Sequence, residues 1–221
     1  MDNKKQEDSM NNQKQNKQPD ERSGVLLQGH IKIFDPESEE VYVDKRNAIH
    51  YENMSEALAL NVSNKNSQFI SEMHFGNGGT TVDPTGVITY LPTNTNVQNA
   101  DLYSPQYYKI VDNTNSANAD PTRNKIEVIH TPGFIYTDIV ISCLLDYGEP
   151  SGQAVFDNSQ TLNGDFVFDE LGLKGFTTSG AGLGKLLTHV IFSPVQKSLN
   201  RLIQIDYTVR IQTLTNLSTN A

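Results

Sequence analysis

Residues 201–212 show the pattern that most constrains the fold of this chain. Polar and apolar side chains alternate there: Ile203, Ile205, Tyr207, Val209 and Ile211 against Gln204, Asp206, Thr208, Arg210 and Gln212. Successive side chains of a β-strand point to opposite faces, so this alternation predicts an antiparallel strand with one buried and one solvated face.

Several other segments repeat this period of two. Residues 30–34 and 40–43 flank the turn-forming sequence Asp35-Pro36-Glu37-Ser38 and predict a hairpin. Longer strands are predicted at 69–75, 135–147, 166–173 and 186–193, and shorter ones at 86–90 and 106–111. Strands of this kind joined by turns, without an internal repeat, predict an all-β fold, an antiparallel β-sandwich.

One short α-helix is predicted near the start of the folded part. Asn53 is suited to cap it, and Glu56 three residues later completes a capping box. Met54, Leu58 and Val62 follow one another at a spacing of four and share a face. The sequence Asn64-Lys65-Asn66 is expected to end the helix.

The composition changes near Gly24 and divides the chain into a flexible N-terminal arm, residues 1–23, and a single β-sandwich domain, residues 24–221. In the arm only Met1 and Met10 are apolar, too little to offset chain entropy, so we expect it to be disordered. The alternative is an extended arm that becomes ordered against a neighbouring subunit. A chain of 221 residues builds a core without disulfides, which agrees with its single cysteine, Cys143.

The charge of the chain argues against two classes of partner. The formal net charge is −9, and the charges within residues 1–23 cancel, so the domain carries the whole excess. An acidic domain repels phosphate backbones and anionic lipids, so we expect no nucleic acid and no membrane as partners. No run of 18 apolar residues and no secretory signal are present, and we expect a protein made and kept inside a cell, or released by lysis.

Two glycine-rich segments resemble phosphate-binding loops, but each lacks an essential feature. Residues 76–80 lack the Gly-Lys-Ser/Thr ending and open no helix, so we predict a structural turn. In residues 179–186, Ser179 replaces the first glycine and Leu186 the magnesium-binding hydroxyl. We predict a flexible loop between two strands.

The remaining candidate chemical groups favour structural roles. The five histidines show no metal-binding spacing, and His74 and His189 are predicted to be hydrogen-bonded surface residues on the polar sides of their strands. Cys143 falls on an apolar strand face, where a buried inert thiol is expected. Asp169 and Glu170 are adjacent, so we expect their side chains to point to opposite faces and to share no substrate.

A hydrolase also lacks support in the sequence. Asp146 and Glu149 flank Tyr147-Gly148 and are read as turn residues, and no GxSxG motif is present. The sequence therefore predicts a protein that is not an enzyme, with no catalytic, cofactor-binding or metal-binding residues and no cofactor.

Several motifs in order carry a resemblance to a known class of proteins. They are MHFGNGGTTVDPTGVITY (73–90), NADLY (99–103), EPSGQ (149–153), FDELGL (168–173) and LTHVIF (187–192). Together they resemble an uncharacterised family of tailed-bacteriophage virion structural proteins over about residues 28–212. A fainter likeness is to the baseplate-attachment segments of tail-fibre proteins, through Phe75–Gly79 and Glu170–Leu173.

The resemblance implies a structural component of a tailed-phage virion, of the tail, baseplate or neck region, assembled in the host cytoplasm. Its partners would be copies of itself, as a homo-oligomer, and other virion proteins. The arm and the loop-rich residues 92–124 are expected to make intersubunit contacts. The residues predicted to contact other subunits are Gly76, Asn77, Gly78, Gly79, Tyr103, Tyr107 and Tyr108.

Three alternatives remain open at this point. The chain would also suit a capsid decoration protein of the head. A receptor- or glycan-binding module would need an exposed aromatic groove, for example around Tyr103, Tyr107 and Tyr108, although the chain has no Trp and is only 8% aromatic. An enzyme acting on a cell-envelope polymer would need two converging carboxylates or a metal centre.

Overall fold

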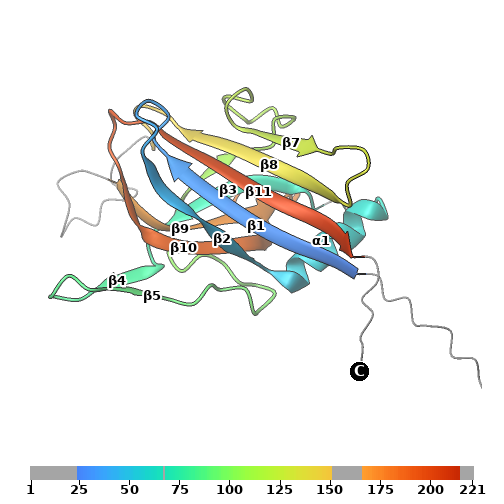
Figure 1. The fold of residues 1–221 in the computed structure, drawn as a ribbon, viewed down its shortest axis with the longest axis horizontal. Helices are drawn as coiled ribbons and strands as arrows, with labels where there is room; N and C mark the ends of the chain where they lie inside the picture. Colours follow the sequence, from blue (N-terminus) through green and yellow to red (C-terminus); the bar gives the residue numbers. More distant parts are fainter. Residues whose placement is uncertain (1–23, 67, 151–165, 215–221) are drawn as a thin grey trace, which may run out of the picture.

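The computed structural model describes residues 24–66, 68–150 and 166–214, and it is mostly antiparallel β-structure with one helix (Figure 1). The elements are β1 (Gly24–Phe34), β2 (Val41–Ile49), α1 (Tyr51–Val62), β3 (Ile70–Gly76), β4 (Thr80–Val82), β5 (Ile88–Tyr90), β6 (Pro105–Ile110), β7 (Lys125–Ile129), β8 (Tyr136–Leu145), β9 (Phe166–Gly175), β10 (Leu186–Lys197) and β11 (Ile203–Leu214).

Nine of the strands form one curled sheet in the order β6-β3-β9-β10-β2-β1-β11-β8-β7, and β4 and β5 pair separately. Strand β2 makes the corner: it pairs with β1 as far as Asn47, and then Ala48 and Ile49 pair with β10. We call β2, β1, β11, β8 and β7 the first half of the sheet, and β10, β9, β3 and β6 the second half. Figure 1 shows the first half in front of the second. The predicted all-β, sandwich-like fold is confirmed.

The hydrophobic core lies between the two halves. Phe168 of β9 meets the ring of Phe75 edge-on at 5.5 Å between centroids and that of Phe192 at 5.7 Å. From the first half, Ile31 and Tyr207 are fully buried in the same cluster. Burial of aromatic and branched side chains is the main force that holds the halves together.

The outer faces of the two halves differ. On the first half, outward side chains such as His30, Arg46 and Arg210 are exposed or half-buried. On the second half, β3 is buried along its whole length, because residues 77–104 and 176–185 lie over its outer side. Most of the second half is therefore the middle layer of the molecule, whereas its edge strand β6 stays partly exposed.

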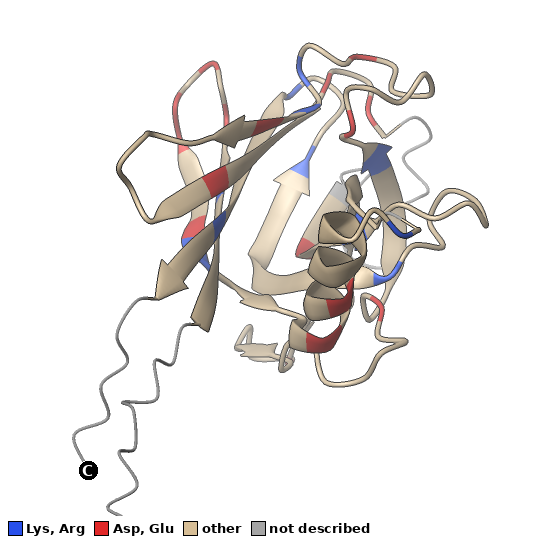
Figure 2. Ribbon diagram, turned by 90° about the vertical axis from the view of Figure 1, so that its right-hand side faces the viewer, with Lys and Arg blue, Asp and Glu red and all other residues tan. Residues whose placement is uncertain are grey.

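The helix α1 lies at one end of the curled sheet, as the view along the long axis in Figure 2 shows. The predicted cap at Asn53 is wrong, because the N-cap is His50, three residues earlier, whose side chain accepts the amide N–H of Asn53 at 3.2 Å. Asn53 is buried, and its amide donates to the Leu186 carbonyl at 2.8 Å. Val62 is 88% exposed, so it does not share the buried face of Met54.

Most predicted strands are present, with shifted ends. In β11, Ile203, Ile205, Tyr207 and Val209 are buried and the residues between them are not, which confirms the alternation. The β1–β2 hairpin is confirmed, and the Asp35 carboxylate accepts the Glu37 amide N–H at 2.8 Å in its turn. Strand β8 is shorter than expected, since its predicted end residues Ile135 and Tyr147 are 51% and 50% exposed. Strands β4 and β7 were not predicted.

The predicted arm, residues 1–23, lies outside the described residues. Within the part of the chain that the structure describes, no helix is long and apolar enough to cross a membrane.

Candidate functional site

A buried carboxylate on β9 anchors two loops that cover the second half of the sheet. The Glu170 side chain is completely buried and accepts amide N–H groups from Ser104 at 2.7 Å, Tyr103 at 2.9 Å and Gly78 at 3.1 Å. Burial alone would raise the pKa of Glu170, but the hydrogen bonds from His189 and these amides outweigh it and lower the pKa. The carboxylate therefore stays ionised and holds both loops.

Asp169 binds the same glycine-rich turn from the neighbouring position. Its carboxylate accepts the Gly79 amide at 2.9 Å, the Thr80 amide at 2.8 Å and the Thr80 hydroxyl. Burial raises the pKa of Asp169 in spite of these hydrogen bonds. The start of β4 is thus tied directly to β9.

The prediction that Asp169 and Glu170 point apart is wrong. Both carboxylates bind consecutive amides of one turn. Phe168 and Leu171, three positions apart, both lie in the core, so strict alternation is interrupted between them. The β9–β10 pairing shifts register beside this point, and such an irregularity re-aims side chains.

The prediction of surface histidines is also wrong, because loops cover the outer side of the second half. His189 is fully buried, and its Nδ1 accepts the amide N–H of Asn94 at 2.8 Å. Its Nε2 must then carry the proton, and it lies 3.0 Å from the Glu170 carboxylate, to which it donates. All the polar atoms of this imidazole are used inside the chain, so His189 holds the fold and faces no substrate.

A second buried pair, Glu72 and His74, lies on β3. His74 is 3% exposed, and its Nε2 lies 2.8 Å from Glu72, whose carboxylate also accepts the Gly182 amide at 2.9 Å. Burial lowers the pKa of His74. Burial would raise the pKa of Glu72, but the hydrogen bonds from His74 and Gly182 dominate and lower it. This pair anchors the 176–185 loop over the sheet.

The residues predicted to contact other subunits come together in one region. Gly76, Asn77, Gly78 and Gly79 join β3 to β4, and Tyr107 and Tyr108 on β6 pair with Phe75 and His74. The β-carbon of any larger residue at position 78 would lie 2.9 Å from Cβ of Tyr103. Gly76 and Gly79 are buried, whereas Tyr103 and Tyr108 are each 41% exposed. Their role as contacts stays a prediction.

The glycine-rich turn leads into the hairpin β4–β5, which projects from the body (Figure 1). At its base, the Tyr90 hydroxyl lies 2.7 Å from the Ser193 hydroxyl, and Leu91 donates to the Gly79 carbonyl at 2.9 Å. Every residue from 81 to 90 is exposed, including Val82 at 59% and Val87 at 58%. Sequence reasoning recognised the turn but not the hairpin that it supports.

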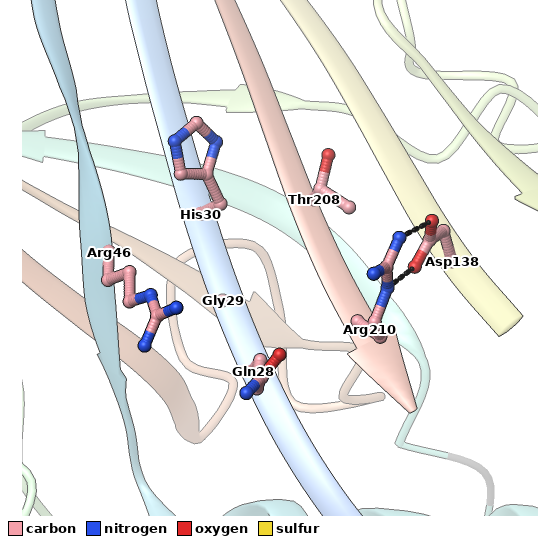
Figure 3. A pocket seen from close by; sticks show the side chains of 7 residues that line it. All are labelled: Gln28, Gly29, His30, Arg46, Asp138, Thr208 and Arg210. Atoms are coloured by element: carbon pink, nitrogen blue, oxygen red, sulfur yellow. Dashed lines mark hydrogen bonds and ion pairs between the residues drawn. The ribbon is translucent and has the colours of Figure 1, made fainter. Parts of the chain in front are cut away.

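A polar pocket of about 390 Å³ lies on the outer face of the first half (Figure 3). Arg210 donates to both oxygens of Asp138 at 2.7 and 2.8 Å, and His30 lies 2.7 Å from the Asp44 carboxylate. Arg46, by contrast, has no hydrogen bond or ion pair to any described residue, and Figure 3 shows its side chain pointing from β2 towards Gln28 and Gly29 of β1. Of the two arginines that line the pocket, Arg210 is paired with Asp138, and Arg46 is available to bind an anion.

The groups that could carry covalent or metal chemistry have limited access. Cys143 is buried as predicted, and burial raises the pKa of its thiol to about 12. Asp146 and Glu149 lie in a turn, as predicted, where the Glu149 amide donates to the Asp146 carbonyl at 3.1 Å. Among the described residues, no three His, Cys, Asp or Glu side chains gather as a metal site would require. Residues 176–185 form the loop between β9 and β10, as predicted.

No family model, no curated protein and no solved structure matches this chain.

Proposed function

We propose that this protein is a non-enzymatic structural subunit of a tailed-phage particle that works through subunit–subunit contacts. The observation that carries the proposal is the hairpin β4–β5, which presents apolar side chains to solvent on strands of only three residues each. An isolated two-stranded hairpin is marginally stable in water, and exposed apolar side chains mark interaction surfaces. A hairpin of this kind is suited to be buried against a partner.

The anchoring of the hairpin supports the same function. Asp169 accepts the Gly79 and Thr80 amides and Glu170 accepts the Gly78 amide, so both carboxylates hold the turn that precedes β4. A rigid base holds the projecting element in one orientation, which lowers the entropic cost of docking. The motifs around this turn are also those that resemble virion structural proteins, which favours a phage particle, and within it the tail, baseplate or neck.

The test is to locate the protein on purified phage particles by immunogold labelling. Gold along or below the neck is the expected result. Gold over the head would contradict the proposed tail position and indicate a capsid decoration protein. No gold on intact particles, with the protein present in the lysate, would contradict the structural function.

The polar pocket of Figure 3 favours one second candidate, a receptor- or glycan-binding module that takes an anionic sugar. The Arg46 guanidinium, which has no described partner and lies on the Gln28 side of this pocket, is suited to a carboxylate or phosphate group. For this function we expect binding on a glycan array that falls at least tenfold in the Arg46→Ala variant. Equal binding by both proteins, or none by either, would remove this candidate.

A further inference from the structure

An apolar pocket of about 330 Å³ opens between the helix and the strands β7 and β8, at the end of the molecule opposite the hairpin (Figure 1). The apolar residues that line it are Met54, Ala57, Leu58, Phe69, Ile70, Ile126, Val128, Ile139 and Leu187. Val128 is 68% exposed at its edge. Removing apolar surface of this kind from water is favourable, so an apolar occupant would be stabilised in this pocket.

The polar atoms around this pocket indicate what kind of occupant it suits. Gln68 lines the pocket, and its buried Oε1 accepts no hydrogen bond from any described residue. A buried acceptor without a donor costs on the order of 1–3 kcal/mol, which an N–H or O–H group of an occupant would recover. Among the described strands β7 pairs only with β8; the Asn113 side chain accepts the Ile126 amide N–H at 3.2 Å, and the rest of its outer edge is left for a further strand. Apolar side chains on an extended backbone satisfy both conditions.

The hairpin of a second copy has these properties. Val82 on β4, Ile88 on β5 and Val87 in the turn between them are 59%, 37% and 58% exposed, and the strand backbones carry N–H donors. Burying these side chains in the body of the same chain would require the hairpin to fold back, and its base is held in place by Asp169.

Charge opposes contact between these two surfaces less than it opposes contact between other parts of two copies. The chain carries a net charge of −9, so two copies repel each other over most of their surface. Asp83 is the only charged residue in 80–91, and Asp112 is the only charged residue lining the pocket.

We propose that the β4–β5 hairpin of one copy docks in the pocket between α1 and β7 of a second copy, which joins the copies head to tail. The inference rests on the proposed assembly function and names the surfaces that carry it. Because the two surfaces differ, the contact is heterologous and builds a ring or a helical stack. A contact of a few side chains is weak alone and becomes strong when closure of a ring joins many of them.

The test is a disulfide cross-link between two single-cysteine variants of the full chain. Val87→Cys places a thiol on the hairpin and Val128→Cys places one at the pocket, both at exposed positions, whereas the native Cys143 is buried. We expect the mixture to give at least tenfold more covalent dimer than either variant alone. Val25→Cys, equally exposed but on β1, replaces the hairpin variant as the matched control.

Cross-linking of each variant with itself as efficiently as in the mixture would indicate a symmetric contact and overturn the proposal. So would a mixture that gives no more dimer than the Val25→Cys control. Sedimentation of Ile88→Asp and Val128→Asp provides the second measurement. Each variant alone should lose self-association at least tenfold, and a mixture of the two should recover pairs through the one intact hairpin and the one intact pocket.

These outcomes separate the contact from the function. Gold labelling of particles together with a failed cross-link would refute the docking and leave the structural function standing. A specific cross-link together with unlabelled particles would support the docking and refute the virion function.

Discussion

Lys197 shows at the scale of one residue how burial changes a charge. Its side chain is fully buried on β10, and its Nζ donates to the carbonyls of Ser198 at 2.8 Å and Asp146 at 3.0 Å. Burial lowers the pKa of Lys197 to about 8, although the carboxylates of Glu149 and Asp146 nearby oppose the shift. Burying the protonated Lys197 side chain therefore lowers the free energy of unfolding, and this loss disappears as the pH rises and the side chain releases its proton.

We predict that the wild type gains stability relative to Lys197→Met as the pH rises. The folded state loses the proton near pH 8 and the unfolded state near pH 10.5, so between these values the unfolded state binds more protons and stability rises with pH. The difference in free energy of unfolding should shift by about 1–3 kcal/mol in favour of the wild type. Urea titrations at both ends of this range measure it.

A difference between the wild type and Lys197→Met that stays constant from pH 8 to pH 10.5 would show that Lys197 does not release its proton near pH 8.

At the scale of elements, the main connection is between β9 and the loops that cover it. Glu170 accepts amides from residues 92 and 66 positions away in the sequence, Gly78 and Ser104. We predict that Glu170→Gln lowers the free energy of unfolding by about 2–4 kcal/mol at neutral pH, since amide donors then face an NH₂ group. Hydrogen exchange should speed up at Gly78, Tyr103 and Ser104.

The pH dependence of this variant follows from the lowered pKa of Glu170. A carboxyl group whose pKa is lower in the folded state contributes stability above its unfolded pKa of 4.5 and loses it as the pH falls through the folded value. The difference in free energy of unfolding between the wild type and Glu170→Gln should therefore become smaller as the pH falls below 4.5. Glu127→Gln is the control: this side chain of β7 is half-exposed, so its replacement should lower the free energy of unfolding only slightly. A similar cost for both variants would contradict the anchoring role.

At the scale of the whole molecule, the curled sheet separates two kinds of surface. The outer face of the first half is open, polar and hollowed beside Arg46, whereas the second half is covered by its own loops. The hairpin and the apolar pocket lie at opposite ends of the long axis (Figure 1). This arrangement favours assembly along one direction, with the polar face left free for another ligand.

The sequence by itself determined the elements whose environment is local. The alternation in 203–209 predicts a strand with one buried and one solvated face, and in β11 the side chains between the buried residues are indeed partly exposed. The turn at Asp35 and the burial of Cys143 also follow from neighbouring residues. The glycine-rich turn at 76–79 was predicted as a turn, although its partners were not.

Only the tertiary structure decided the environment of the polar side chains on β3, β9 and β10. His74 and His189 lie on the polar sides of their strands, as the sequence suggests, yet loops from elsewhere in the chain bury them. Alternation is interrupted between Phe168 and Leu171, so that Asp169 and Glu170 both bind the glycine-rich turn. Nothing in the neighbouring sequence indicates this interruption. Periodicity reports which face a side chain takes, but burial depends on what covers that face, and here the cover comes from segments distant in sequence.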